Sequence, residues 1–131
     1  MQLKFEDELI QRAMEAQRKA YAPYSEFLVG AAIRTSDGAI ATGCNVENAS
    51  YGLTMCAERA AIFAMVNHGG REIESVVIVS RGGVTPCGAC RQVLAEFGLN
   101  YPVVLVDSET GAVQARWLMR DLLPGAFRLS N

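Results

Sequence analysis

Apolar residues between positions 5 and 20 recur at spacings of three and four, which predicts a helix with one apolar face. Pro23 ends this pattern, because a proline ring cannot continue a helix. A second helix is predicted over residues 56–67, a segment dense in Ala, Glu, Arg and Met that ends at Gly69-Gly70. Both helices are long enough to cover a sheet.

Strands are predicted between and after these helices. Residues 28–35 and 39–46 flank Ser36-Asp37-Gly38, where glycine permits the positive φ of a tight turn, so they should form a hairpin. Residues 75–80 are rich in β-branched residues without alternation, which is typical of a strand buried on both faces. The later patterns predict a helix at 88–97, strands at 103–106 and 113–116, and a short helix at 118–123.

A hairpin followed by strands that alternate with helices indicates the α/β class. We expect three layers, α/β/α, with a mixed sheet of about five strands and helices on both of its faces. The chain has 131 residues, the usual length of one domain, and no linker or repeat interrupts it. Residues 1–131 are therefore predicted to form a single domain.

Composition and charge narrow the possible partners. Half of the residues are hydrophobic, a high share for a small chain, which favours contact with a second subunit. The net charge of −2 argues against nucleic acid as a partner and favours a small uncharged ligand. Apolar stretches are short and residues 5–8 are mostly acidic, so neither a membrane span nor a signal peptide is expected. We expect a cytoplasmic protein.

The four cysteines give the strongest chemical signal. In a reducing cytoplasm they are not expected to form structural disulfides, which favours metal binding or catalysis. Cys87 and Cys90 stand three positions apart where a predicted strand leads into a helix, and Cys56 opens another helix. Helix N-termini favour thiolates, and loops at the carboxyl ends of adjacent strands meet in one crevice. The three sulfurs are therefore predicted to bind one metal ion.

Three protein ligands leave one coordination position open, as in a catalytic zinc site that activates a water molecule. Glu58 follows Cys56 by two positions and is predicted to act as the base for this water. Three thiolates on a divalent ion leave about one net negative charge, which positive groups must offset. Arg59 and Arg91 are candidates for hydrogen bonds to the sulfurs, although either could instead form a surface ion pair.

These residues lie in motifs that resemble the cytidine deaminases. Cys56-Ala57-Glu58 and Pro86-Cys87-Gly88-Ala89-Cys90 look like the zinc site of that family. Residues 22–27, 43–48 and 122–127 are similar to other family segments in the same order, so the resemblance covers nearly the whole chain. The first ligand is cysteine where base-editing, nucleotide and tRNA deaminases commonly have histidine, which makes the short nucleoside deaminases the most similar branch.

The resemblance implies one catalytic domain that binds one Zn²⁺ and hydrolyses cytidine and deoxycytidine to uridine and deoxyuridine, releasing ammonia in pyrimidine salvage. It implies Cys56, Cys87 and Cys90 as zinc ligands and Glu58 as the proton shuttle. It also implies a homotetramer with sites shared between subunits. The implied substrate contacts are Phe27 with the pyrimidine, Asn45 and Glu47 with the ribose hydroxyls, the Ala57 N–H with the base carbonyl, and Tyr51 and Phe127 from neighbouring subunits.

Other interpretations of the same residues are open. A redox pair could be formed by Cys87 and Cys90, but it would leave Cys56 and Glu58 unexplained. A structural zinc with Cys44 as fourth ligand is the non-enzyme alternative. Structural sites usually take their ligands in close pairs, however, so Cys44 is expected to be a core residue. Within the deaminase interpretation, the alternative substrate is a cytosine-containing antibiotic such as blasticidin S.

Bulk patterns also give expectations for residues outside the motifs. Phe63 and Trp117 are expected in the hydrophobic core, because aromatic side chains in a small domain are usually buried. Without the resemblance, Asn45 and Glu47 would be interpreted as residues that hydrogen-bond within a loop.

Overall fold

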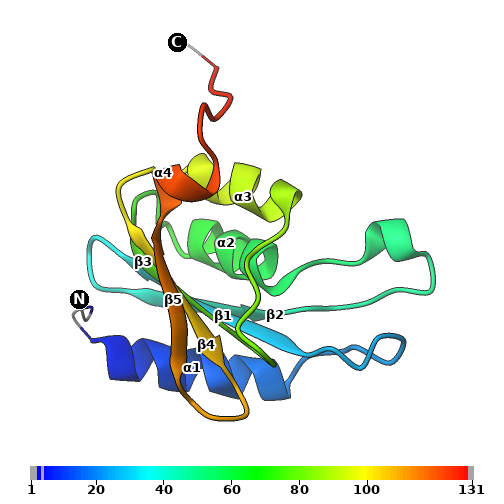
Figure 1. Cartoon of the computed structure of the whole chain (residues 1–131). Helices are drawn as coiled ribbons and strands as arrows, with labels where there is room; N and C mark the ends of the chain where they lie inside the picture. The colour runs from blue at the N-terminus through cyan, green and yellow to red at the C-terminus, as the bar shows by residue number, and fades with distance from the viewer. Residues whose placement is uncertain (1–2, 4, 130–131) are drawn as a thin grey trace.

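The computed structural model describes residues 3 and 5–129, and these form a mixed sheet with helices on both faces (Figure 1). This arrangement confirms the predicted α/β class. No helix in the described part of the chain is long and apolar enough to cross a membrane. In chain order the elements are α1 (Glu6–Arg18), β1 (Val29–Thr35), β2 (Ile40–Cys44), the 3-10 turn η1 (Tyr51–Leu53), α2 (Ala57–Asn67), β3 (Ile73–Ser80), α3 (Gly88–Ala95), β4 (Pro102–Asp107), β5 (Val113–Leu118) and α4 (Met119–Leu122).

The sheet has the strand order β2-β1-β3-β4-β5. β1 is antiparallel to both β2 and β3, β3 is parallel to β4, and β4 is antiparallel to β5. The loops that follow β3 and β4 therefore leave the sheet at the same edge. One of these loops leads directly into α3 and positions its N-terminus at that edge.

The central strand β3 supplies both faces of the core. Val76 and Ile78 pack with α2, α3 and α4 on one face, whereas Val77 and Val79 pack with α1 on the other. All four side chains are almost completely buried, as predicted from the apolar run without alternation. Figure 1 shows α1 on one side of the sheet and the other three helices on the opposite side.

Two glycines let helices approach the hairpin closely. A Cβ on Gly30 would lie 2.0 Å from the carbonyl oxygen of Ala13 in α1, and a Cβ on Gly43 would lie 2.3 Å from the backbone nitrogen of Ala61 in α2. Real Cβ atoms cannot come this near to backbone atoms. The hairpin therefore packs closely against α1 through Gly30 and against α2 through Gly43, and the position of α2 depends on Gly43.

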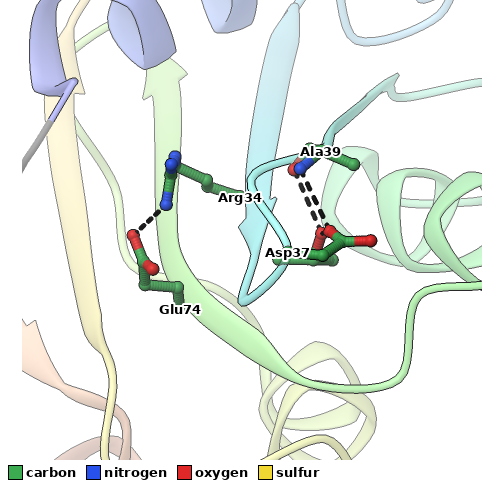
Figure 2. Close-up of polar contacts among 5 residues, drawn as sticks. Arg34, Asp37, Ala39 and Glu74 are labelled. Atoms are coloured by element: carbon green, nitrogen blue, oxygen red, sulfur yellow. Dashed lines mark hydrogen bonds and ion pairs between the residues drawn. The ribbon is translucent and has the colours of Figure 1, made fainter.

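The turn between β1 and β2 confirms the predicted hairpin. Gly38 has a φ of 90°, the left-handed conformation that favours glycine. The Asp37 carboxylate accepts a hydrogen bond of 3.1 Å from the Ala39 N–H (Figure 2) and another from the Thr35 hydroxyl. The turn is thus closed by its own side chains.

Two ion pairs join elements that are distant in the sequence. Arg116 of β5 pairs with Glu6 at the start of α1, where Nη2 donates to Oε2 over 3.0 Å. Glu6 is buried, and its hydrogen bond from Arg116 holds the pKa of its carboxyl group below the ordinary value. Arg34 of β1 pairs with the more exposed Glu74 of β3 (Figure 2).

The expectation that Phe63 and Trp117 belong to the core is wrong. Phe63 is 52% exposed because it lies on the side of α2 that faces away from the sheet, and Trp117 is 41% exposed on the edge strand β5. Cys44 is also not a core residue, since it is only half-buried at the end of β2. The chain itself does not cover these apolar side chains.

Candidate metal centre

Three cysteine sulfurs converge where α2 and α3 begin. Cys56 and Cys87 precede the two helices as N-cap residues, and Cys90 lies in the first turn of α3. Their Sγ atoms all lie within 4.8 Å of one another, and those of Cys87 and Cys90 are 3.4 Å apart. Zn–S bonds of about 2.3 Å in a tetrahedral site separate the sulfurs by about 3.8 Å, so this cluster can hold one zinc ion.

Cys44 lies apart from this cluster. It belongs to a different hollow, which it lines together with Arg12, Glu15 and Lys19 on the α1 side of the hairpin. The three-sulfur group found among the described residues does not include it. The proposed fourth ligand of a structural zinc is therefore not available in this fold.

The sulfur of Cys56 accepts hydrogen bonds from a guanidinium group and from a neighbouring thiol. Arg59, one helical turn further along α2, donates a hydrogen bond of 3.3 Å from Nη2 to Cys56 Sγ. The hydrogen bond from the Cys90 thiol, together with Arg59, lowers the pKa of Cys56 to about 5. The same hydrogen bond and burial raise the pKa of Cys90, so Cys56 is the first of this pair to become a thiolate.

Arg91 does not contact the sulfurs, contrary to one of the two predicted alternatives. Its Nε donates to the carbonyl oxygen of Pro86 over 2.9 Å, and its Nη1 donates to the carbonyl oxygen of Leu122 over 2.8 Å. The side chain stands one turn beyond Cys87 on α3 and turns toward the C-terminal part of the chain. It is not a surface ion pair either, because both of these partners are backbone carbonyls.

Glu58 lies in the first turn of α2, two residues after Cys56, and is only 5% exposed. Burial raises the pKa of its carboxyl group to about 7, and the negative charge of Cys56 adds to this effect. A carboxyl group with a pKa near neutral pH can both accept and release a proton during a reaction. The geometry therefore places a buried carboxyl group, with a pKa near neutral pH, beside the sulfur cluster.

A cavity of about 300 Å³ connects Glu58 with the sulfur cluster. Most of the side chains predicted for the site contribute to its wall, whereas Cys90 is completely buried behind it. The lining residues are Ser25, Phe27, Val29, Asn45, Glu47, Thr54, Cys56, Ala57, Glu58, Ile78, Val84, Thr85 and Cys87.

Asn45 holds one side of this cavity together. Its Nδ2 donates to the carbonyl oxygen of Phe27 over 2.8 Å, and its Oδ1 accepts from the Val29 N–H over 2.9 Å. Both polar ends of the side chain therefore fix the backbone that presents Phe27 to the cavity. Both partners lie in a different segment, so Asn45 joins two parts of the chain and does not hydrogen-bond within its own loop, as the pattern alone had indicated.

Glu47 anchors the same segment from its other end. Its Oε1 accepts from the backbone N–H groups of Tyr24 (2.9 Å) and Ser25 (3.1 Å), and its Oε2 accepts from the Ser25 hydroxyl. The hydrogen bond from Ser25 holds the pKa of Glu47 below its ordinary value. Glu47 is thus an anionic residue in the cavity wall at neutral pH.

Comparison with known proteins identifies the family of this chain. Residues 3–106 match the family described as the cytidine and deoxycytidylate deaminase zinc-binding region. The chain belongs to this deaminase family. It is 44% identical over 123 residues to a cytidine deaminase of Sporosarcina psychrophila, covering 92% of this chain and 90% of the relative. It is 47% identical over 121 residues to a cytidine deaminase of Mycobacterium tuberculosis, covering 91% and 86%.

Solved structures of deaminases have the same fold. The crystal structure of a cytidine deaminase from Burkholderia pseudomallei matches with a TM-score of 0.86 and 48% identity, over 92% of this chain and 98% of that chain. A blasticidin-S deaminase of Bacillus cereus is less similar, with 29% identity over 127 residues. Membership in a zinc-binding deaminase family agrees with the single zinc ion that the cysteine cluster can hold.

Two of the predicted contacts of the deaminase lie outside the cavity of their own chain. Tyr51 in η1 is 62% exposed and packs its ring edge-on against Tyr24, with centroids 6.0 Å apart. Phe127 follows α4 and is 68% exposed. Within one chain, the structure does not bring either side chain to the sulfur cluster.

Sequence reasoning missed two residues that contact the segment carrying Phe27. Ser25 links Glu47 to the segment that carries Phe27, because its hydroxyl also accepts from the Phe27 N–H over 3.0 Å. Serine is a common turn residue, because its hydroxyl can hydrogen-bond to the backbone two residues further on. Arg81 lies with its guanidinium carbon 5.5 Å from the centroid of the Phe27 ring. Nothing local in the sequence indicates this second contact.

Proposed function

We propose that this chain is a deaminase that hydrolyses cytidine and deoxycytidine to uridine and deoxyuridine with release of ammonia. The observation that supports this most strongly is the cluster of Cys56, Cys87 and Cys90 beside a cavity that also contains the buried Glu58. The relatives with 44% and 47% identity that are named cytidine deaminases support the substrate. We place the reaction in pyrimidine salvage and in the cytoplasm, carried out by one catalytic domain over residues 1–131.

In this proposal the three cysteines hold zinc as thiolates, and zinc when bound supplies Lewis acidity that lowers the pKa of a water molecule. Three thiolates carry more negative charge than the ion can neutralise. Arg59 and the N-termini of α2 and α3 offset this excess, since a hydrogen bond from Arg59 and both helix ends point at the sulfurs.

Glu58 moves the protons. Hydrolysis at C4 requires that one water molecule gives one proton to N3 of the base, which uridine keeps, and one to the amino group, which leaves as ammonia. A single buried carboxyl group with a pKa of about 7 can accept each proton and pass it on. Both transfers thus use the same side chain, and no further acid or base is required.

The remaining wall of the cavity would hold the nucleoside. Phe27 offers an apolar surface for the pyrimidine, and Asn45 and Glu47 lie where they could meet the ribose hydroxyls. Ala57 is the first residue of α2, and the N–H groups at the start of a helix have no partner within the helix. Its N–H is therefore suited to hold the carbonyl oxygen of the base. The carboxylate of Glu47 would repel a phosphate, which favours a free nucleoside.

We further propose a homotetramer in which Tyr51 and Phe127 reach the cavities of neighbouring subunits. Both are exposed aromatic residues, Tyr51 in the turn η1 and Phe127 in the segment that follows α4. A hollow of about 590 Å³ also lies between α2 and α3, where the exposed Phe63 accompanies Ile62, Val66, Val93 and Phe97. Apolar surface of this kind typically marks a contact between proteins.

The decisive experiment combines metal analysis with a panel of substrates. The purified protein should contain one zinc per chain and release ammonia from cytidine and deoxycytidine, but not from a single-stranded oligonucleotide. If blasticidin S were turned over faster than cytidine, it would be the substrate in place of the nucleosides. Cys44→Ser should keep zinc and activity, whereas Cys87→Ser should lose both. Loss of zinc in Cys44→Ser would instead support the structural four-cysteine site.

A further inference from the structure

Arg91 joins two parts of the chain that are distant in sequence. Its Nε bonds to the carbonyl oxygen of Pro86, directly before Cys87, and its Nη1 bonds to the carbonyl oxygen of Leu122, at the end of α4. Hydrogen bonds from a charged guanidinium are stronger than those between neutral groups. One side chain thus connects the loop that carries Cys87 to the start of the C-terminal segment, which we define as residues 122–127.

Both carbonyls lie at helix boundaries, where the backbone hydrogen bonds of a helix do not reach them. Pro86 precedes the N-cap of α3 and is buried, and Leu122 is the last residue of α4, so its carbonyl cannot be satisfied within that helix. The planar, rigid fork of an arginine can serve two acceptors at a fixed separation, which the point charge of a lysine cannot do as well. The contact therefore sets the distance between the two carbonyls.

The neighbouring residue completes this attachment. Gln92 donates from Nε2 to the carbonyl oxygen of Phe127 over 3.2 Å, so consecutive residues of α3 hold the two ends of the C-terminal segment. Between these ends, Leu123 and Ala126 pack against the core beside α3. Beyond α4 the chain runs away from the sheet toward the C-terminus (Figure 1), and side chains of α3 hold the segment at both of its ends.

We propose that Arg91 is a positioning residue that couples the metal-binding loop to the C-terminal segment. It keeps Pro86 in place, and Pro86 in turn orients Cys87 toward the other two sulfurs. Through Leu122, the same side chain fixes the segment that carries Phe127. This inference rests on the proposed zinc ligands and on the proposed role of Phe127. It adds that the integrity of the metal centre and the order of the C-terminal segment depend on each other.

The first test measures how fast a chelator removes zinc from the purified holoenzyme. Arg91→Met keeps the length of the side chain but loses both hydrogen bonds, and its zinc should leave about tenfold faster or more, as expected when groups that support metal ligands are removed. Gln92→Ala should release zinc at the wild-type rate, because Gln92 does not contact the metal-binding loop. Arg71→Met is the matched control, since Arg71 also donates to two backbone carbonyls, those of Val66 and Gly70, far from the sulfurs.

The second test measures the coupling itself by hydrogen exchange of peptides that span residues 119–127. In the wild-type protein, removal of zinc should speed exchange in this segment. In Arg91→Met, exchange should already be fast with zinc bound and should change little when zinc is removed. Gln92→Ala should raise KM for cytidine more than it lowers kcat, because it releases only the end of the segment at Phe127.

Zinc release from Arg91→Met at the wild-type rate would overturn the inference, as would unchanged exchange of residues 119–127 when the wild-type protein loses zinc. If Arg91→Met does not fold, Arg91→Lys replaces it, with Arg71→Lys as control, and the same acceleration is expected in smaller degree. A wild-type protein that binds no zinc would contradict the proposed function. If the wild-type enzyme binds zinc and Arg91→Met releases zinc at the same rate, only this inference is contradicted.

Discussion

Glu58 and Arg59 are consecutive residues with opposite charges, and each serves a different part of the site. Arg59 points its guanidinium at Cys56, whereas Glu58 is buried in the cavity wall and has a pKa of about 7. The two side chains point in different directions because consecutive residues of a helix are about 100° apart around its axis. One turn of helix thus carries both the guanidinium that contacts a sulfur and the buried carboxyl group to which we assign proton transfer.

Replacing Glu58 tests this division of roles. Glu58→Ala should keep zinc and the fold, because the cysteines alone provide the ligands, but kcat for cytidine should fall by about 10²–10⁴-fold. Zinc content, circular dichroism and steady-state kinetics measure the three quantities. Glu72→Ala, an exposed glutamate beyond the end of α2, serves as control and should behave as wild type. Normal turnover by a zinc-loaded Glu58→Ala would contradict the mechanism, and loss of zinc would make Glu58 a ligand.

The predictions from sequence succeeded where a contact is local. Cys87 and Cys90 share one turn of helix, so their spacing indicates that they meet, and Arg59 reaches a sulfur three residues away, which was one of the two alternatives left open for it. Arg91 shows the limit of this reasoning. It follows a cysteine directly, yet one of its two acceptors is the Leu122 carbonyl, which it reaches only because α4 packs against α3, a contact that no local pattern reports.

At the scale of elements, the close contact of α2 with the hairpin determines where Cys56 and Glu58 lie. α2 can approach β2 only because Gly43 has no side chain. The sequence showed the hairpin and the helix through their periodicities, but not that they touch. The turn η1 was also missed, since a segment of three residues is too short to show a period.

Adding one methyl group at this contact should disturb the site. Gly43→Ala places a Cβ 2.3 Å from the Ala61 nitrogen, so α2 must shift, and overpacking of this kind costs about 1–3 kcal/mol of unfolding free energy. Because α2 carries Cys56, zinc should also be lost more readily. Gly52→Ala is the control, as a Cβ there meets nothing within 4 Å. Equal stability of the two variants in urea would contradict the close approach.

The ion pair between α1 and β5 should make stability depend on pH. The folded-state pKa of Glu6 lies below its ordinary value of 4.5, so its contribution is fully present above that pH and is lost as the pH falls through the lowered pKa. Arg116→Met should therefore destabilise the protein at pH 7, by about 1–2 kcal/mol for a pair with one partly exposed member. The difference from wild type should shrink at more acidic pH.

The measurement for this pair is urea unfolding of both proteins at several pH values. Glu74→Gln is the control, because Glu74 pairs with Arg34 at a site where its side chain is 40% exposed and should contribute little. A constant difference between Arg116→Met and wild type across the acidic range would mean that Arg116 acts through packing and not through its charge.

At the scale of the whole molecule, alternation of strands and helices was sufficient to predict three layers and a mixed sheet. It was not sufficient to assign every apolar residue to the core. Phe63 and Trp117 are as hydrophobic as the buried residues, but the chain leaves them exposed. A sequence pattern shows that a side chain is apolar. It does not show whether residues of the same chain or of a second copy bury that side chain.

Mixed oligomers can show whether Phe127 acts in its own chain or in a neighbour. Glu58→Ala and Phe127→Ala chains should each have low activity alone, and light scattering should give both four times the chain mass of 14.2 kDa. When the two are mixed and refolded together, activity should rise, because an intact Glu58 in one chain meets an intact Phe127 from another. Mixing Glu58→Ala with a chain that has both substitutions should give no increase, since no chain then has Glu58. If the first mixture is no more active than the average of its parts, Phe127 serves its own chain or no site, and its exposed ring must have another role.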